Sequence, residues 1–228
     1  DLLGYDMELG MGYVYNGYPR DAQYGDRPPA IGFDFFRGPM VPSPGDTVRL
    51  PDGTIYPDRK ILGATSFVKY YNPHPIFRDP PYSAQGAEEV WNYMNGTQRD
   101  GKPWINPITG QPSTFLNTGD PVTGTGWLST AESPPADVRI LTSSGMFTLA
   151  PGDTQVVVAG VVIGQGTNRL SSVSVLRFYD KFAQAAYDAG FKVPSPPKAP
   201  EVTVTPLDRE ILLSWKANAE DYEEFGYE

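Results

Sequence analysis

The chain has 228 residues, enough for one sizeable core or for one core and part of a second domain. Its net charge of −9, without any cluster of lysine or arginine, excludes nucleic acid as a partner. It has no cysteine, which excludes disulfides and thiol chemistry, and no apolar run approaches the roughly 18 residues that a membrane-spanning helix needs.

The chain holds 24 glycines and 24 prolines, while 39% of its residues are hydrophobic and 13% are aromatic. Frequent turns together with ample material for a core favour a folded, mainly β protein over a disordered one. We therefore expect short strands, long loops and one or two packed helices.

In chain order, the first clear strand follows the glycine- and tyrosine-rich residues 1–30. Residues 30–35 alternate large apolar with small or polar side chains, as a half-buried strand does. Turns rich in proline, glycine and aspartate predict a hairpin of residues 47–50 with 54–56. A longer strand is expected over 61–71.

Ser83 is expected to cap a helix over 84–95, and Asn95-Gly96 would end it. Apolar residues at helical spacing predict its buried face. These residues are Ala87, Val90, Trp91 and Met94. Residues 100–136 are the least regular part of the chain, which we expect to be packed by its own aromatic side chains.

After residue 137, strands are expected over 138–142 and 146–149. Residues 155–163 are almost continuously apolar and β-branched, which predicts a central strand buried on both faces. A helix over 169–189 is expected to pack on the sheet that contains this strand, because its apolar residues form one stripe. The stripe consists of Val173, Leu176, Tyr179, Phe182, Ala183 and Ala186.

Four prolines within residues 193–200 favour a stiff polyproline spacer. The spacer divides the chain into a β-rich domain, residues 1–192, and a shorter unit, residues 201–228. That unit holds two alternating strands, which cannot close a sandwich by themselves. Its apolar side chains would be covered by strands that follow, by the first domain or, in our preferred interpretation, by another chain through β-augmentation. The candidate interchain contacts are Val202, Val204, Leu213 and Trp215.

Residues 197–215, with prolines before the first strand and a Leu-x-Trp at the end of the second, resemble the opening of a fibronectin type III domain. Residues 144–155, 28–39 and 119–127 resemble segments of large secreted proteins of Bacteroidetes-type bacteria. In those proteins an immunoglobulin-like sandwich precedes fibronectin repeats and a type IX secretion sorting signal. The resemblance implies an immunoglobulin-like β-sandwich, a partial fibronectin type III-like hairpin and an extracellular or cell-surface location. It implies no activity.

No catalytic constellation is recognisable in the sequence. The single histidine, His74, lies between two prolines, where we expect a packing role rather than catalysis. Glu88 and Glu89 are adjacent on the predicted helix and would diverge, and nothing in the sequence joins Glu8 to Asp34 as a glycosidase pair. We therefore expect that the protein is not an enzyme.

Two kinds of ligand site remain open. Oxygen-bearing side chains near glycines would suit Ca²⁺, although turn formation explains them equally well. These calcium candidates are Asn16, Asp21 and Asp26. Tyrosine rings would stack on sugars if they were exposed, although most aromatic residues fill the core of such proteins. These ligand candidates are Tyr13, Tyr15, Tyr18 and Tyr24.

The leading expectation is a non-catalytic structural or adhesive module of a secreted bacterial surface protein. Its partners would be identical subunits or other domains of a longer chain, and no cofactor other than calcium is expected. The alternative is a carbohydrate-binding accessory module of a secreted multidomain hydrolase, which would require an exposed aromatic platform.

Overall fold

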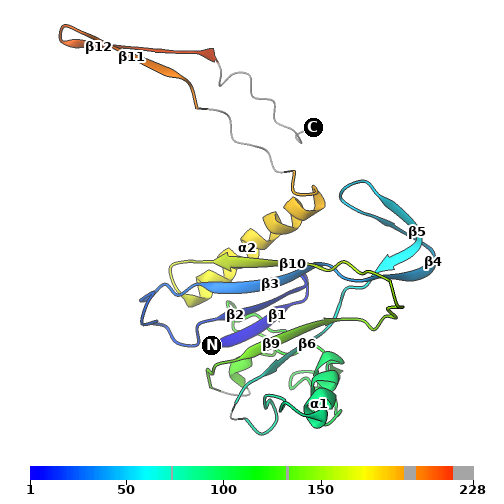
Figure 1. Cartoon of the computed structure of the whole chain (residues 1–228). Helices are drawn as coiled ribbons and strands as arrows, with labels where there is room; N and C mark the ends of the chain where they lie inside the picture. Colours follow the sequence, from blue (N-terminus) through cyan, green and yellow to red (C-terminus); the bar gives the residue numbers. More distant parts are fainter. Residues whose placement is uncertain (73, 132–133, 193–198, 218–228) are drawn as a thin grey trace.

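The computed structural model describes residues 1–72, 74–131, 134–192 and 199–217 of the chain (Figure 1). The described residues form a mainly β fold with twelve strands and two α-helices, which are joined by long loops. The expected mainly β class is therefore confirmed. Two of the sheets pack face to face, which is consistent with the expected β-sandwich.

The central sheet is antiparallel, with the strand order β1-β2-β3-β10. Its strands are β1 (Leu2–Asp6), β2 (Met11–Tyr15), β3 (Ala30–Arg37) and β10 (Val158–Gly164). β1 and β2 lie in the glycine-rich N-terminal region, in which no strand was expected. Their side chains nevertheless alternate between the two faces of the sheet, and large ones are buried on both.

Glycines make room for these large side chains. Tyr13 is directly opposite Gly4 in the register of β1 and β2, and a side chain at Gly4 would collide with the Tyr13 ring. On the other face, a side chain at Gly12 would collide with the ring of Phe67. The glycines that obscure the strand pattern in the sequence therefore permit close packing on both faces.

Helix α2 (Arg169–Asp188) covers one face of the central sheet (Figure 1). Asn168 caps its first turn, and the side chain of Ser171 bonds back to the Asn168 backbone, which completes a capping box. Val173 and Leu176 are fully buried in the core between helix and sheet. The helix backbone approaches β10 closely at Gly164, where a side chain would collide with the backbone of Leu176.

The predicted packing of this helix on the sheet is confirmed, but the predicted apolar stripe is wrong because it is too wide. Tyr179 and Phe182 are 49% and 60% exposed, because the buried face is narrow and also contains Ser172 and Asp180. The prediction that residues 155–163 form a central strand buried on both faces is also wrong. β10 lies at the edge of the described sheet and leaves Val161 exposed, because α2 covers only one face of it.

A second sheet covers the other face. It pairs β6 (Ala64–Tyr70) with β9 (Arg139–Ser144), and Phe67 packs against Leu3 and Tyr5 of β1. Helix α1 (Ala84–Met94) lies beyond this sheet, so the layers run from α2 through two sheets to α1 (Figure 1).

Helix α1 begins at the predicted cap, where the Ser83 hydroxyl accepts the backbone N–H of Gly86. The predicted apolar face is wrong, since Trp91 and Met94 are 52% and 42% exposed. The buried residues of this helix are instead Gly86, Glu89 and Tyr93.

A separate aromatic core holds the long loops around α1, β7 (Trp104–Ile105), β8 (Pro112–Ser113) and the 3-10 turn Ser129–Ala131. The rings of Phe77 and Trp104 stack with centroids 4.9 Å apart, and Trp127 is buried in the same cluster. The irregular region is packed by its own aromatic residues, as expected.

Two hairpins extend from these layers. The first joins β4 (Met40–Arg49) to β5 (Ile55–Ile61) and confirms the predicted hairpin, although its strands are longer. The second joins β11 (Val202–Leu207) to β12 (Glu210–Trp215). The strand expected over 146–149 does not form. Most of the predicted spacer (193–198) and the C-terminal residues 218–228 lie outside the described residues.

The buried position of Leu176 provides a test of the packing between α2 and the sheet. Leu176→Ala is expected to lower the free energy of unfolding by about 2–5 kcal/mol, because it removes a fully buried side chain. Phe182→Ala, on the exposed side of the same helix, should lower it by less than about 1 kcal/mol. Urea denaturation followed by circular dichroism measures both values, and similar losses would contradict this orientation of the helix.

Candidate functional site

The structure separates the four candidate ligand-binding tyrosines into two pairs. Tyr13 and Tyr15 are buried beneath α2, with their ring centroids 6.2 Å apart. Tyr18 and Tyr24 are exposed in the loop between β2 and β3. A ligand role is therefore wrong for Tyr13 and Tyr15, because their rings fill the core.

The calcium candidates form turns instead of a cation site. Asn16 Nδ2 donates to Asp21 Oδ2 at 3.0 Å, and Asp21 Oδ1 accepts the backbone N–H groups two and three residues further on. These backbone donors hold the pKa of Asp21 below its usual value. Asp26 lies 3.9 Å from Arg20, on the exposed surface. Within the described parts of the chain, no group of three or more acidic or histidine side chains is arranged to hold a metal ion.

His74 has the packing role that its position between prolines suggested. Its ring contacts those of Tyr71 and Phe77, at centroid distances of 5.1 and 4.9 Å. Its Nδ1 accepts the backbone N–H groups of Ile76 and Phe77 at 3.2 and 3.0 Å. The histidine therefore organises the loop that follows β6.

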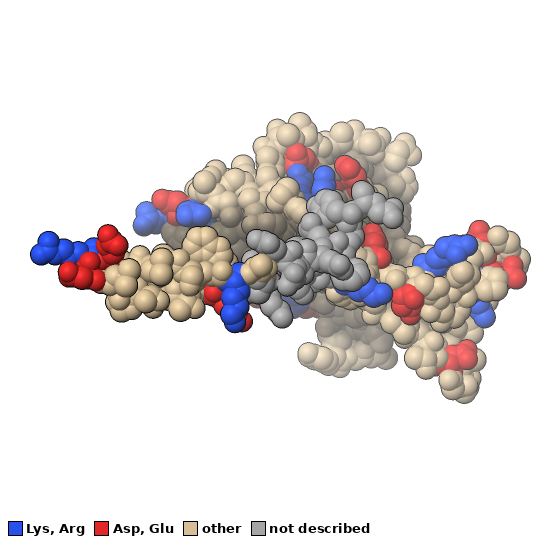
Figure 2. Space-filling view, turned by 90° about the horizontal axis from the view of Figure 1, so that it is seen from above, with Lys and Arg blue, Asp and Glu red and all other residues tan. Residues whose placement is uncertain are grey.

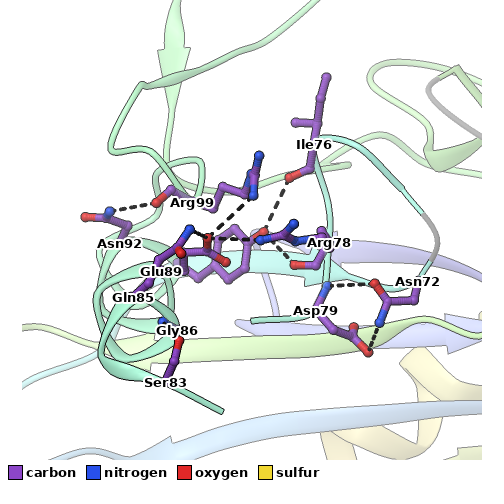
Figure 3. Close-up of polar contacts among 11 residues, drawn as sticks. Asn72, Ile76, Arg78, Asp79, Ser83, Gln85, Gly86, Glu89, Asn92 and Arg99 are labelled. Carbon is purple, nitrogen blue, oxygen red and sulfur yellow. Dashed lines mark hydrogen bonds and ion pairs between the residues drawn. The ribbon is translucent and has the colours of Figure 1, made fainter. Parts of the chain in front are cut away.

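Glu89 is the centre of a polar network on α1 (Figure 3). It is only 4% exposed, and its Oε1 accepts a hydrogen bond from Gln85 Nε2 at 3.0 Å. The same oxygen lies 3.3 Å from Arg78 Nη2 and 3.4 Å from Arg99 Nη1. One turn further on, the Tyr93 hydroxyl donates to the carbonyl oxygen of Arg78 at 2.9 Å. These contacts bind two loops to the helix, so we interpret the network as structural.

A cleft of about 1080 Å³ opens beside this network. Its walls include the ring of Tyr70, the fully exposed ring of Tyr82 and two prolines, together with polar side chains. Asn72 Nδ2 donates to Asp79 Oδ2 at 3.0 Å, and Arg139 Nη1 lies 3.2 Å from the same carboxylate oxygen. Ring faces next to fixed polar groups are the combination with which proteins bind sugars.

A second polar cluster lies beneath α2. Arg177 Nε is 2.9 Å from Asp6 Oδ2, and Arg177 Nη1 donates to Asp120 Oδ1 at 2.8 Å. One guanidinium thus joins β1, α2 and the loop at residue 120. Asp34 and Asp180 lie nearby, 3% and 1% exposed, and each has a buried oxygen without a hydrogen-bond partner.

Burial, followed by the charges of Asp34 and Asp6, raises the pKa of Asp180 to about 7. Burial also raises the pKa of Asp34. Asp180 therefore holds a proton at pH values where an exposed aspartate has lost it. The sequence contained a signal for this group, because Asp180 continues the helical spacing of Val173 and Leu176 on the buried face.

A third hollow, called here the apolar groove, lies between α1, β9 and the segment that leads from β9 to β10. Its volume is about 680 Å³, and none of its described lining residues is charged. Trp91 and Met94, which were expected in the core, form one wall, and Met146 and Phe147 form another. Met146 is 75% exposed. The sequence indicated apolar residues at these positions but not the surface that they create.

The four candidate interchain residues lie on one face of the C-terminal hairpin. In the register of β11 and β12, Val202 pairs with Trp215 and Val204 pairs with Leu213. The four side chains are 52% to 69% exposed. The expectation that the first domain covers Trp215 is therefore wrong for the described chain, and coverage by another chain stays a prediction. Figure 2 shows charged side chains at the two ends of the hairpin and an uncharged stretch between them.

Comparison of the chain with protein-family models, curated proteins and solved structures returns no match. In the described parts of the chain, no helix is both long and apolar enough to cross a membrane.

The buried Asp180 predicts a pH dependence of stability. The folded state keeps its proton up to about pH 7, whereas the unfolded state loses it near pH 3.8. At this group the folded state thus binds more protons between these values, so the contribution of Asp180 to the free energy of unfolding should fall as the pH rises from about 4 to about 7.

Asp180→Asn mimics the protonated side chain and should remove most of this fall, with a higher melting temperature than the wild type at pH 8. Asp188→Asn, an exposed change on the same helix, should melt like the wild type at both pH values. Thermal melts at pH 5 and pH 8 measure the effect. An Asp180→Asn variant with the wild-type pH dependence would contradict the buried proton.

Proposed function

We propose that this protein is a non-catalytic structural or adhesive module of a bacterial cell-surface protein, and that its C-terminal hairpin attaches it to another copy of the chain. The location is supported by the sequence resemblance alone. The attachment is supported by the hairpin itself.

The observation that carries the proposal is the uncovered apolar face of β11 and β12. All residues of both strands are exposed, and one face consists of three apolar cross-strand pairs. These pairs are Val202–Trp215, Val204–Leu213 and Pro206–Ile211. An isolated hairpin is only marginally stable in water, so a covered face would favour its folding. Its strand edges also leave backbone groups free to pair with another strand.

The proposal is tested by the association state of the full chain. Sedimentation over a wide concentration range should show reversible association, and Trp215→Ser should weaken it roughly 30-fold or more, because a buried tryptophan is a typical interface anchor. Leu212→Ser is the matched control, since Leu212 is also exposed, at 55% against 69% for Trp215, but lies on the opposite face of the hairpin. A wild-type chain that stays monomeric at all concentrations would overturn the proposal.

The second candidate function is carbohydrate binding in the cleft beside Tyr70 and Tyr82. It is favoured by the fully exposed Tyr82 ring at a cleft with fixed polar side chains. Tyr18 and Tyr24 supply further exposed rings, on a different loop.

If the cleft binds a sugar, Tyr82→Ala should weaken the affinity roughly two- to tenfold, as expected for the loss of one stacked ring. Tyr24→Ala should leave the affinity unchanged. Titration calorimetry with a panel of soluble glycans provides the measurement, and this candidate is rejected if Tyr82→Ala binds as well as the wild type.

A further inference from the structure

The apolar groove is bordered by a segment with a strand-like sequence that has no strand partner in the described structure. Residues 145–157 connect β9 to β10 and form no ladder, although they include two mainly apolar stretches, 146–149 and 156–157. Met146, Leu149 and Val156 are 75%, 54% and 48% exposed. Such residues favour a pleated surface, and here Met146 is mostly exposed while Leu149 and Val156 are about half exposed.

The groove also lies along an open strand edge. β9 pairs with β6 on one side, and no described strand pairs with its other side. Leu141 to Ser144 of β9 line the groove. A partner that fits this surface needs a free strand edge together with an uncharged apolar face.

The C-terminal hairpin has both properties. It is a two-stranded sheet with open edges, and its apolar face carries Trp215, Leu213 and Val204. Its charged residues are Glu201, Asp208, Arg209, Glu210 and Lys216, all at the two ends of the hairpin. Lys216 Nζ and Glu201 Oε2 form an ion pair of 2.6 Å at one end. The stretch between the two ends carries no charged residue.

Charged residues make up 20% of the chain, and both surfaces lack them. A random partner surface of this acidic protein would bring carboxylates against the groove, and burying an unpaired charge is costly. Among the strand pairs that the structure describes, the C-terminal hairpin combines a fully apolar face with open edges.

We propose that the apolar groove receives the C-terminal hairpin of a second copy of the chain. This inference rests on the proposed function and names the surface that the hairpin binds. Because groove and hairpin are different patches, the contact is heterologous, and a bound pair of copies still offers one free groove and one free hairpin. Repetition of the contact builds an open chain of subunits rather than a closed dimer, unless the rotation between copies closes a ring.

The test uses two full-length variants that block opposite halves of the contact. Met146→Glu places a charge at the groove and leaves the hairpin free, whereas Trp215→Glu places a charge on the hairpin and leaves the groove free. Both positions are highly exposed, so both variants should fold, and circular dichroism checks this. Ile108→Glu and Leu212→Glu are the matched controls, at exposed apolar positions outside the groove and on the opposite hairpin face.

We expect the wild type and both controls to form assemblies larger than dimers. Each blocked variant alone should associate at least about tenfold more weakly, since its contact would bury a charge. An equimolar mixture should form a complex of two chains of 25.0 kDa each and stop there, because only one groove and one hairpin remain usable. Sedimentation velocity and light scattering distinguish these species.

Three results would overturn the inference in different ways. If Met146→Glu associates like the wild type while Trp215→Glu does not, the hairpin binds elsewhere, and the proposed function survives without the groove. If both variants are monomeric and their mixture is also monomeric, the two patches do not meet each other. If the wild type is monomeric, the proposed function fails together with the inference.

Discussion

The architecture depends on a pair of strands that is buried on both faces. β1 and β2 pack against α2 on one side and against β6 on the other, so the side chains on both faces of these strands are buried. The two faces can be filled with rings only because Gly4 and Gly12 leave space for Tyr13 and Phe67. The layers on either side are positioned by this contact.

Polar groups at the boundaries between layers orient the helices. Arg177 joins α2 to β1 and to the loop at Asp120, and the buried Asp180 adds a proton-dependent contribution on the same helix face. On α1 the buried Glu89 has a similar role, because it forms ion pairs with Arg78 and Arg99. Inside the fold these charged groups are paired or, in the case of Asp180, protonated.

The exposed surfaces of the protein differ in their charge. Most of the acidic residues that the structure describes are exposed, while the apolar groove and one face of the C-terminal hairpin carry no charged side chain. A protein that exposes two such surfaces is suited to contacts with other polypeptides. The cleft beside Tyr82 differs from both, because it combines rings with paired polar side chains and suits a smaller, polar ligand.

The sequence by itself determined the mainly β class, both helices, the Ser83 cap of α1, the hairpin of residues 47–50 with 54–56 and the alternation of β11 and β12, because each depends on local spacing or turn chemistry. It could not determine which face of a helix is buried: Trp91 and Phe182 are exposed although they are among the largest apolar residues of their helices. Nor could it identify β1 and β2 as the centre of the fold, because glycine lowers the propensity of a segment to form a strand. In these strands glycine is required, because Gly4 and Gly12 leave room for the rings of Tyr13 and Phe67. The groove and the buried Asp180 depend on segments far apart in the chain, so only the tertiary structure decided them.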